Sequence, residues 1–115
     1  MLKKCLTIAG SDSSGGAGVQ DDLKTFSALG TYGMSCICAL TAQNTQGVDK
    51  VENVSQAMIR GQLAAIYSDI VPDAVKTGML YCREAVETVA GFLESHNQDP
   101  LGVDPVMVAT NGTRI

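Results

Sequence analysis

A run of glycine, serine and aspartate residues lies near the start of the chain, between an apolar segment and a segment with helical spacing. Residues 9 to 26 read AGSDSSGGAGVQDDLKTF, with four glycines, three serines and three aspartates. Glycine-rich turns that lead from a strand into a helix commonly bind phosphate, because backbone N–H groups at a helix N-terminus favour an anion. Phosphate binding is therefore the first chemistry to test against the sequence.

The glycine loop does not fit either of two common phosphate-binding patterns. Gly10 and Gly15 have the spacing of a Walker A loop, but Gly16 and Ala17 stand where that loop needs lysine and serine or threonine. The dinucleotide pattern fails as well, because GAG is followed by VQD and its third glycine is missing. Peptide without Cβ atoms instead permits a flat ligand to approach closely. A tight turn before an acid-capped helix is the alternative interpretation.

Composition limits the classes of partner. The 115 residues are close to the commonest size of one domain. A formal net charge of −4, with basic residues mostly scattered singly, argues against nucleic acid and against anionic membrane. The sequence shows no apolar run near the roughly 18 residues that a membrane span needs. The apolar stretch at its N-terminus is too short for a signal peptide, so we expect a cytoplasmic protein.

Cysteine usage argues against a zinc site. The cysteines form no CxxC pair, and the chain has one histidine, so we expect buried, reduced thiols. The four residues concerned are Cys5, Cys36, Cys38 and Cys82. Cys36 and Cys38 alternate within an apolar run, which predicts that they share one face of a strand.

Apolar runs alternate with segments of helical spacing along the chain. We expect strands at 3–9, 34–42, 74–80 and 100–108, with residues 43–54 forming a loop and a short edge strand. This strand–helix alternation predicts a parallel α/β sheet, in which ligands bind beyond the carboxyl ends of the strands. Small, polar and glycine residues concentrate in the loops at those ends, namely 9–18, 41–47, 77–81 and 104–112.

Three helices are expected between these strands. The first carries Val19, Leu23, Phe26 and Leu29 at helical spacing and ends at Gly30 as its cap. The second begins at a Ser55 cap and stops at Pro72, and the third spans 83–95. The remaining apolar faces comprise Ile59, Leu63, Ile66 and Ile70 in the second helix, and Val86, Val89 and Leu93 in the third.

Four stretches together carry a resemblance to a known family. LTIAGSDSSGGAGVQDDLKTFSALGTYGMS, ALTAQNTQGV, VKTGML and VDPVMVATNG, in this order, resemble the hydroxymethylpyrimidine/phosphomethylpyrimidine kinases of thiamin biosynthesis. The resemblance implies a ribokinase-like three-layer α/β/α fold with a mainly parallel sheet. It also implies ATP and Mg²⁺, phosphorylation of hydroxymethylpyrimidine and then of its monophosphate, and a homodimer with residues 43–54 at or near the interface.

The resemblance implies roles for particular residues. The glycine loop would form the wall and floor of a pyrimidine pocket, Gln43 would offer its amide to the ring edge, and Asp104 would lie near Mg²⁺ and the transferred phosphate. The residues implied to line the pyrimidine are Gly10, Ala17, Asp22, Gln43, Met79 and Val106. Each role has a plainer alternative: a helix-capping residue for Asp22, a solvated loop residue for Gln43, core residues for Met79 and Val106, and a strand-end turn for Asp104.

The sequence departs from the family in length. Members are more than twice as long, and their second half carries a G-x-G-D segment, with its general base, and the ATP-binding residues. We therefore expect residues 1–115 to be the N-terminal part of the kinase domain, without catalytic residues of its own and inactive alone. Alternatives are a pyridoxine or pyridoxal kinase, a non-catalytic pyrimidine-binding module, or a piece that is completed by a partner chain.

Overall fold

The computed structural model describes residues 2–98 and 102–103. In chain order the elements are β1 (Lys4–Ala9), α1 (Gly18–Ala28), β2 (Tyr32–Ile37), β3 (Ala39–Asn44), β4 (Gly47–Asn53), α2 (Gln56–Tyr67), β5 (Ala74–Thr77), α3 (Arg83–Ser95) and β6 (Gly102–Val103). The predicted strand 74–80 is therefore shorter, and of the predicted strand 100–108 the described residues contain β6 alone.

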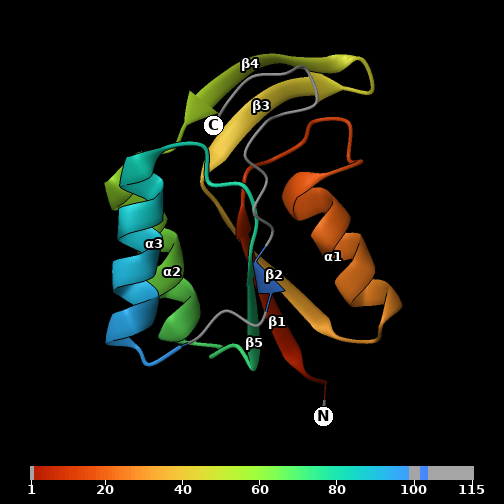
Figure 1. Ribbon diagram of the computed structural model, residues 1–115. Coiled ribbons are helices and arrows are strands. Elements are labelled where there is room, and N and C mark those ends of the chain that lie inside the picture. The colour runs from red at the N-terminus through yellow and green to blue at the C-terminus, as the bar shows by residue number, and fades with distance from the viewer. Residues whose placement is uncertain (1, 99–101, 104–115) are drawn as a thin grey trace.

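Four parallel strands form the central sheet of the described chain, in the order β2-β1-β5-β6. Helix α1 covers one face of this sheet, and α2 and α3 cover the other (Figure 1). The three layers confirm the predicted α/β architecture. The chain winds outward from β1 to β2 and then returns to place β5 on the other side of β1. Ligands bind at such a reversal of strand order, beyond the carboxyl ends of the strands.

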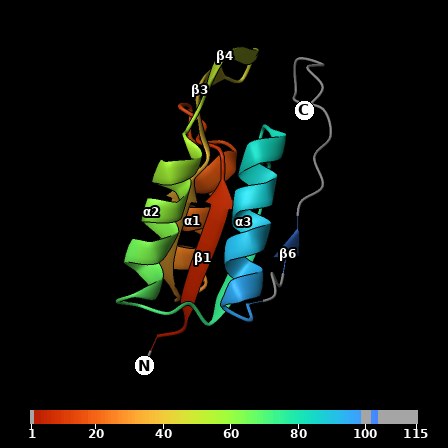
Figure 2. The same ribbon diagram turned by 90° about the vertical axis from the view of Figure 1, so that its left-hand side faces the viewer.

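The predicted strand 34–42 is wrong as one element, because the chain leaves the central sheet at Cys38. The N–H of Cys38 donates to the Ala9 carbonyl and its own carbonyl accepts from Val54, which ends the pairing with β1. Strands β3 and β4 then pair with each other as an antiparallel hairpin. The hairpin rises beyond the carboxyl ends of the parallel strands (Figure 2). Residues 43–54 accordingly contribute to this hairpin and not to an edge of the main sheet.

The core lies between the sheet and the α2–α3 layer. Cys36 and Cys38 are fully buried, and all four cysteines are free, as predicted. A hydrogen bond with Cys38 and burial raise the pKa of the Cys36 thiol. Cys5 and Cys82 are half-buried, contrary to the expectation of buried thiols. The buried cluster comprises Leu6, Ile8, Cys36, Cys38, Ile59, Leu63, Val75, Ala85, Val89 and Leu93.

The predicted helix caps are confirmed, whereas parts of the predicted apolar faces are wrong. The Ser55 hydroxyl accepts from the Met58 N–H at 3.1 Å, and Gly30 follows the first helix with a φ of +76°. Val86 is 49% exposed and Leu29 is 73% exposed. Helix α3 instead buries a stripe that begins one residue earlier, at Ala85, because that stripe is the one that faces the sheet and α2. Helix α2 ends at Tyr67, so the predicted Ile70 lies beyond it.

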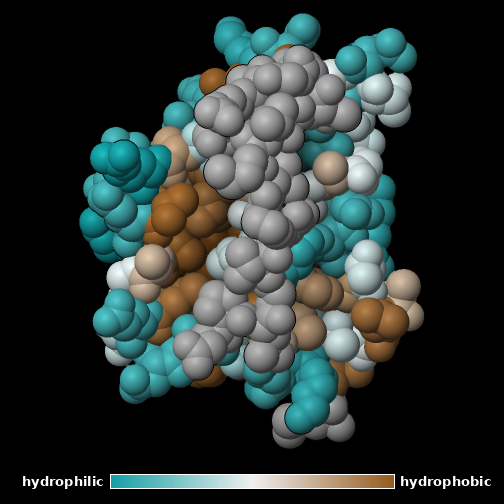
Figure 3. All heavy atoms as spheres, in the orientation of Figure 1, coloured by the Kyte–Doolittle hydropathy of each residue, from teal (hydrophilic) through white to brown (hydrophobic). Residues whose placement is uncertain are grey.

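Hydrophobic side chains gather on the surface between α3 and β5 (Figure 3). The exposed Val86 belongs to α3. Within the described part of the chain, none of the helices has the length and apolar character that a membrane span requires.

Candidate functional site

Three loops meet at the carboxyl edge of the central sheet. The loop after β1 bonds to the loop after β5, because the Gly10 N–H donates to the Met79 carbonyl at 3.0 Å. It also bonds to the start of the hairpin, since the Ser11 N–H donates to the Ala39 carbonyl at 2.8 Å. Segments far apart in the sequence are thus fixed against one another where the α/β sheet predicts a ligand.

The carboxylate of Asp12 accepts hydrogen bonds from within the glycine loop. Its Oδ1 accepts from the Ser14 N–H at 2.9 Å and from the Ser14 hydroxyl at 2.8 Å. Burial raises the pKa of Asp12, but the bonds from Ser14 and from the N–H groups of Ala17 and Gly16 outweigh it, and the net pKa is lowered. The Ser14 amide thus serves a carboxylate of the protein, and a second anion beside that carboxylate would be repelled.

Gln20, in the first turn of α1, makes two hydrogen bonds to this loop. Its Oε1 accepts from the Asp12 N–H at 2.8 Å, and its Nε2 donates to the Ser11 hydroxyl at 2.7 Å. One amide therefore satisfies two neighbouring loop residues. Sequence reasoning assigned no role to Gln20, because a polar residue early in a helix usually faces solvent.

Gln43 lies in the hairpin and is tied to the same loop. The Ser13 hydroxyl donates to the Gln43 carbonyl at 2.6 Å and accepts from the Gln43 N–H at 2.8 Å. The pairing register shifts between Ala42 and Gln43, an irregularity of the kind that redirects a side chain. The Gln43 Oε1 lies 3.2 Å from the Thr41 hydroxyl, whereas its Nε2 makes no hydrogen bond to any described residue. Gln43 is half-buried as a residue, and its Nε2 group retains hydrogen-bonding capacity for a ligand.

Asp22 occupies a different place from the loop residues. Its Oδ2 accepts from the Thr7 hydroxyl at 2.6 Å, and its Oδ1 pairs with the Lys76 ammonium at 2.5 Å. This buried carboxylate joins α1 to β1 and β5 beneath the loop. Its bonds are to other elements and not to the start of its own helix, where Ala17 is the capping residue.

Tyr81 stands directly against Gly10. A Cβ atom on Gly10 would meet the Tyr81 Cε2 atom at 2.2 Å, so the ring occupies the space that any larger residue at position 10 would need. Tyr81 also adopts a φ of +75°, which is uncommon for a residue with a side chain. Burial and the negative charge of Asp12 raise the pKa of its phenol.

The structure brings four of the predicted pyrimidine-lining residues to the carboxyl edge. Gly10 is buried, Ala17 is exposed at the start of α1, and Gln43 and Met79 are half-buried. Asp22 lies beneath them. Asp104 and Val106 fall outside the described residues. Sequence reasoning missed Asp12, Gln20 and Tyr81. Aspartate in a glycine- and serine-rich loop is typical of a turn, and Tyr81 lies outside the four stretches that resemble the family.

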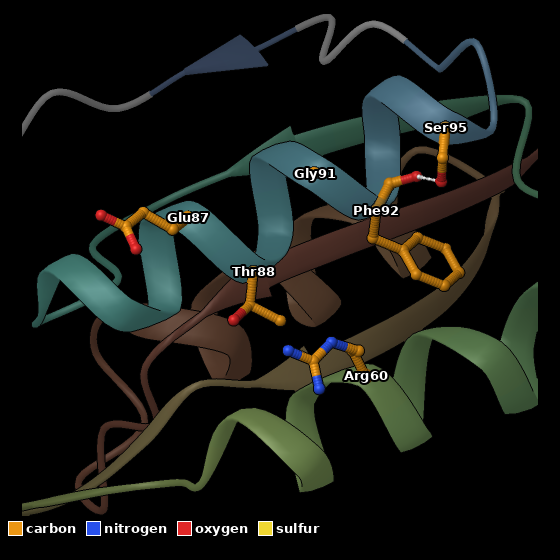
Figure 4. A pocket seen from close by; sticks show the side chains of 6 residues that line it. All are labelled: Arg60, Glu87, Thr88, Gly91, Phe92 and Ser95. Atoms are coloured by element: carbon orange, nitrogen blue, oxygen red, sulfur yellow. Dashed lines mark hydrogen bonds between the residues drawn. The ribbon is translucent and has the colours of Figure 1, made fainter.

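A hollow of about 330 Å³ lies between α2 and α3, away from this edge. Its lining residues are Arg60, Glu87, Thr88, Gly91, Phe92 and Ser95. Figure 4 shows Arg60 reaching from α2 toward α3, while the Glu87 carboxylate points away from it. Nothing in this lining pairs groups for catalysis. Likewise, residues 2–98 and 102–103 contain no group of three or more His, Cys, Asp or Glu side chains placed to hold a metal.

Comparison with known proteins gives one consistent family. Residues 12–115 match the family model for phosphomethylpyrimidine kinase. The chain is 55% identical over 112 residues to the hydroxymethylpyrimidine/phosphomethylpyrimidine kinase of Rhizobium meliloti, covering 97% of this chain and 42% of that protein. The chain thus spans less than half the length of that curated relative.

Solved structures agree with this match. The phosphomethylpyrimidine kinase of Clostridium difficile superposes with a TM-score of 0.90 and 52% identity, over 98% of this chain and 49% of that one. The pyridoxal kinase of Staphylococcus aureus, solved with AMP-PCP and pyridoxal, has a TM-score of 0.79 and 42% identity, over 93% of this chain and 40% of that one. Kinases named for two different rings therefore share this fold.

Proposed function

Because the chain belongs to the phosphomethylpyrimidine kinase family, we propose that it supplies the substrate-binding part of a kinase that phosphorylates hydroxymethylpyrimidine and its monophosphate in thiamin biosynthesis. The observation that carries this proposal is the meeting of three loops at the carboxyl edge of the sheet. Gly10 and Met79 are hydrogen-bonded there, and Gln43 is tied to the same glycine loop through Ser13.

The edge offers the contacts that a planar, polar ring needs. The Gln43 amide both donates and accepts, so it fits a ring nitrogen next to an exocyclic amine. Met79 presents a polarizable apolar side chain, which suits the face of an aromatic ring. The exposed Ala17 and the uncovered backbone at Gly16 leave room above the loop, where a Cβ on Gly16 would lie 3.7 Å from the Asp12 carboxylate.

Asp22 has a supporting part in this proposal. Its two oxygens already contact Thr7 and Lys76, and the acceptor capacity that remains on each carboxylate oxygen would serve a substrate hydroxyl that reaches below the loop. Val106, as the second apolar face of the ring, belongs to the proposal through the family motif alone.

ATP as phosphate donor and Mg²⁺ near Asp104 also belong to the proposal. A solved relative with an ATP analogue, the Staphylococcus aureus pyridoxal kinase, supports the nucleotide. The described residues do not fit a triphosphate at the glycine loop, because the Asp12 carboxylate already places a negative charge there and accepts the Ser14 N–H. ATP would supply the phosphoryl group, and no described residue is assigned to that transfer.

The proposal extends to location and assembly. Four free cysteines fit a reducing compartment, and we propose a cytoplasmic protein. Leu40 and Val51 of the hairpin are exposed apolar residues, which supports a homodimer formed through residues 43–54 or close to them.

Calorimetry with hydroxymethylpyrimidine tests the binding function. We expect micromolar affinity for the wild-type chain and about tenfold weaker binding for Gln43→Ala, the loss of roughly one hydrogen bond. Gln46→Ala is the matched control, because Gln46 lies in the turn of the same hairpin and is exposed. Absence of binding, or equal weakening by both substitutions, would contradict the proposal.

A further inference from the structure

We propose that Tyr81 is a specificity-determining residue of this site, whose ring covers Gly10 and restricts the site to the pyrimidine in preference to pyridoxal, whose ring carries bulkier substituents. The inference rests on the proposed function and deepens it by separating two substrate classes. It starts from a contact in the described structure, namely that of the Tyr81 ring with the Gly10 backbone.

The first step is the packing of the two residues. A Cβ on Gly10 would lie 2.2 Å from Cε2, 2.9 Å from Cδ2 and 3.1 Å from Cζ of Tyr81. The ring therefore closes the side of Gly10 that a side chain would otherwise fill. Since Gly10 is itself buried, the Tyr81 ring borders the glycine loop at this point, where a ligand bound over the loop would meet it.

The second step is the backbone of Tyr81. Its φ of +75° lies in the left-handed region, which a residue with a Cβ enters at a cost of about 1 kcal/mol or more. Such conformations persist where the surroundings hold them, and they concentrate at ligand sites. The neighbouring Cys82 already begins α3 as its N-cap residue. The backbone of Tyr81 is thus fixed by the adjacent start of α3. A side chain that excludes larger ligands needs such a fixed position.

The third step is the chemistry of the two rings. Both are planar and carry a hydroxymethyl group, but pyridoxal has a ring hydroxyl and an aldehyde where the pyrimidine has a ring nitrogen and an amine. Pyridoxal therefore needs more room at its edge. Because a pyridoxal kinase shares this fold at 42% identity, discrimination between the rings must come from local side chains. In this chain Tyr81 is the bulky group set against the glycine loop.

The matched substitution is Tyr81→Gly. Glycine adopts a positive φ without strain, so this variant removes the ring and keeps the backbone. Tyr81→Phe keeps the ring and removes the hydroxyl. Tyr32→Ala is the control, because Tyr32 is a half-exposed tyrosine at the first residue of β2, at the opposite edge of the sheet.

Calorimetry with hydroxymethylpyrimidine and with pyridoxal, on each variant, gives the test. We expect Tyr81→Gly to shift the ratio of the two affinities toward pyridoxal by about tenfold, the lower end of what one small group contributes in a tight pocket. Tyr81→Phe and Tyr32→Ala should keep the wild-type ratio. Thermal unfolding of each variant confirms that the fold is intact.

Two results overturn the inference, and they are distinguishable. If Tyr81→Gly binds both rings with the wild-type ratio, Tyr81 does not set specificity, while the proposed pyrimidine site stands. If the wild-type chain binds neither ring, the proposed function fails and the inference fails with it.

Discussion

The carboxylate of Asp12 accepts two hydrogen bonds from Ser14, one from its backbone N–H and one from its hydroxyl. These bonds, with smaller contributions from the backbone of Ala17 and Gly16, lower the pKa of Asp12, so the glycine loop holds an anion that belongs to the protein. The loop resembles a phosphate-binding loop in its composition, but the Asp12 carboxylate already occupies the position beside Ser14 where a phosphate would bind. Space remains at Gly16, where a Cβ would have only the Asp12 carboxylate nearby, at 3.7 Å.

Asp12→Asn should lower the stability of the chain at neutral pH. The variant loses the charge that strengthens the bonds from Ser14, and we expect a loss of about 1–3 kcal/mol in the free energy of unfolding. The lowered pKa means that the contribution of Asp12 is complete above the ordinary value of 3.8 and disappears as the pH falls through the folded-state pKa. Denaturant unfolding at several pH values measures this.

The pH dependence separates this account from a simple packing defect. The stability gap between wild type and Asp12→Asn should close as the pH drops below 3.8. A gap that stays constant across that range would show that the charge of Asp12 contributes nothing.

Lys76 and Asp22 should be energetically coupled. Their ion pair is 34% exposed on the lysine side and 11% on the aspartate side. A double-mutant cycle with Lys76→Met and Asp22→Asn should therefore give a coupling energy of about 1–2 kcal/mol. This value lies between those typical of fully exposed and of fully buried ion pairs. Lys50→Met, an exposed hairpin lysine, is the control and should change stability little. Additive effects in the cycle would refute the coupling.

Gly10→Ala should destabilise the chain through its contact with Tyr81. A Cβ at 2.2 Å from the ring forces the tyrosine to move, and overpacking of this kind costs about 1–3 kcal/mol. Combining it with Tyr81→Gly should recover much of that loss, which thermal unfolding of the single and double variants would reveal. Failure of the second substitution to rescue the first would mean that another contact restricts Gly10.

Gly91→Ala should stabilise the chain. Nothing lies within 4 Å of a Cβ at this position in α3, so the change removes backbone freedom without a clash and should add about 0.5–1 kcal/mol. The same substitution at Gly30, whose φ is +76°, should have the opposite sign. Equal effects at both positions would contradict the conformational explanation.

The sequence predicted the layers of the fold because apolar periodicity and caps are local signals. Ser55 and Gly30 mark helix ends through bonds within a few residues, and both are confirmed. The break at Cys38 was not predictable from the apolar run 34–42. It depends on long-range hydrogen bonds with Ala9 and Val54, and on a hairpin that buries Ala39 and Thr41 while exposing Leu40.

Some residues of the candidate site were predictable from local motifs, and others were not. Gly10, Gln43 and Met79 each match a motif that predicts a position at the carboxyl edge, and all three lie there. Lys76 and Tyr81 contact residues distant in sequence, Asp22 and Gly10, and no local pattern predicts these contacts. Gln20 bonds to residues eight and nine positions before it, a spacing that no helix or turn pattern predicts. Helix α3 shows the limit within one element: Val89 and Leu93 are buried as predicted, but Ala85 and not Val86 continues their stripe toward the start of the helix.

The central claim is that the glycine loop receives a flat ring and not a triphosphate. Backbone amide chemical shifts of Gly10, Gly16 and Gly18, recorded by NMR during separate titrations with hydroxymethylpyrimidine and with ATP, test it most directly. We expect the pyrimidine to shift these signals and ATP to leave them in place, because the negative charge of the Asp12 carboxylate in this loop disfavours a triphosphate beside it. Shifts of these glycines caused by ATP, without any response to the pyrimidine, would contradict the account.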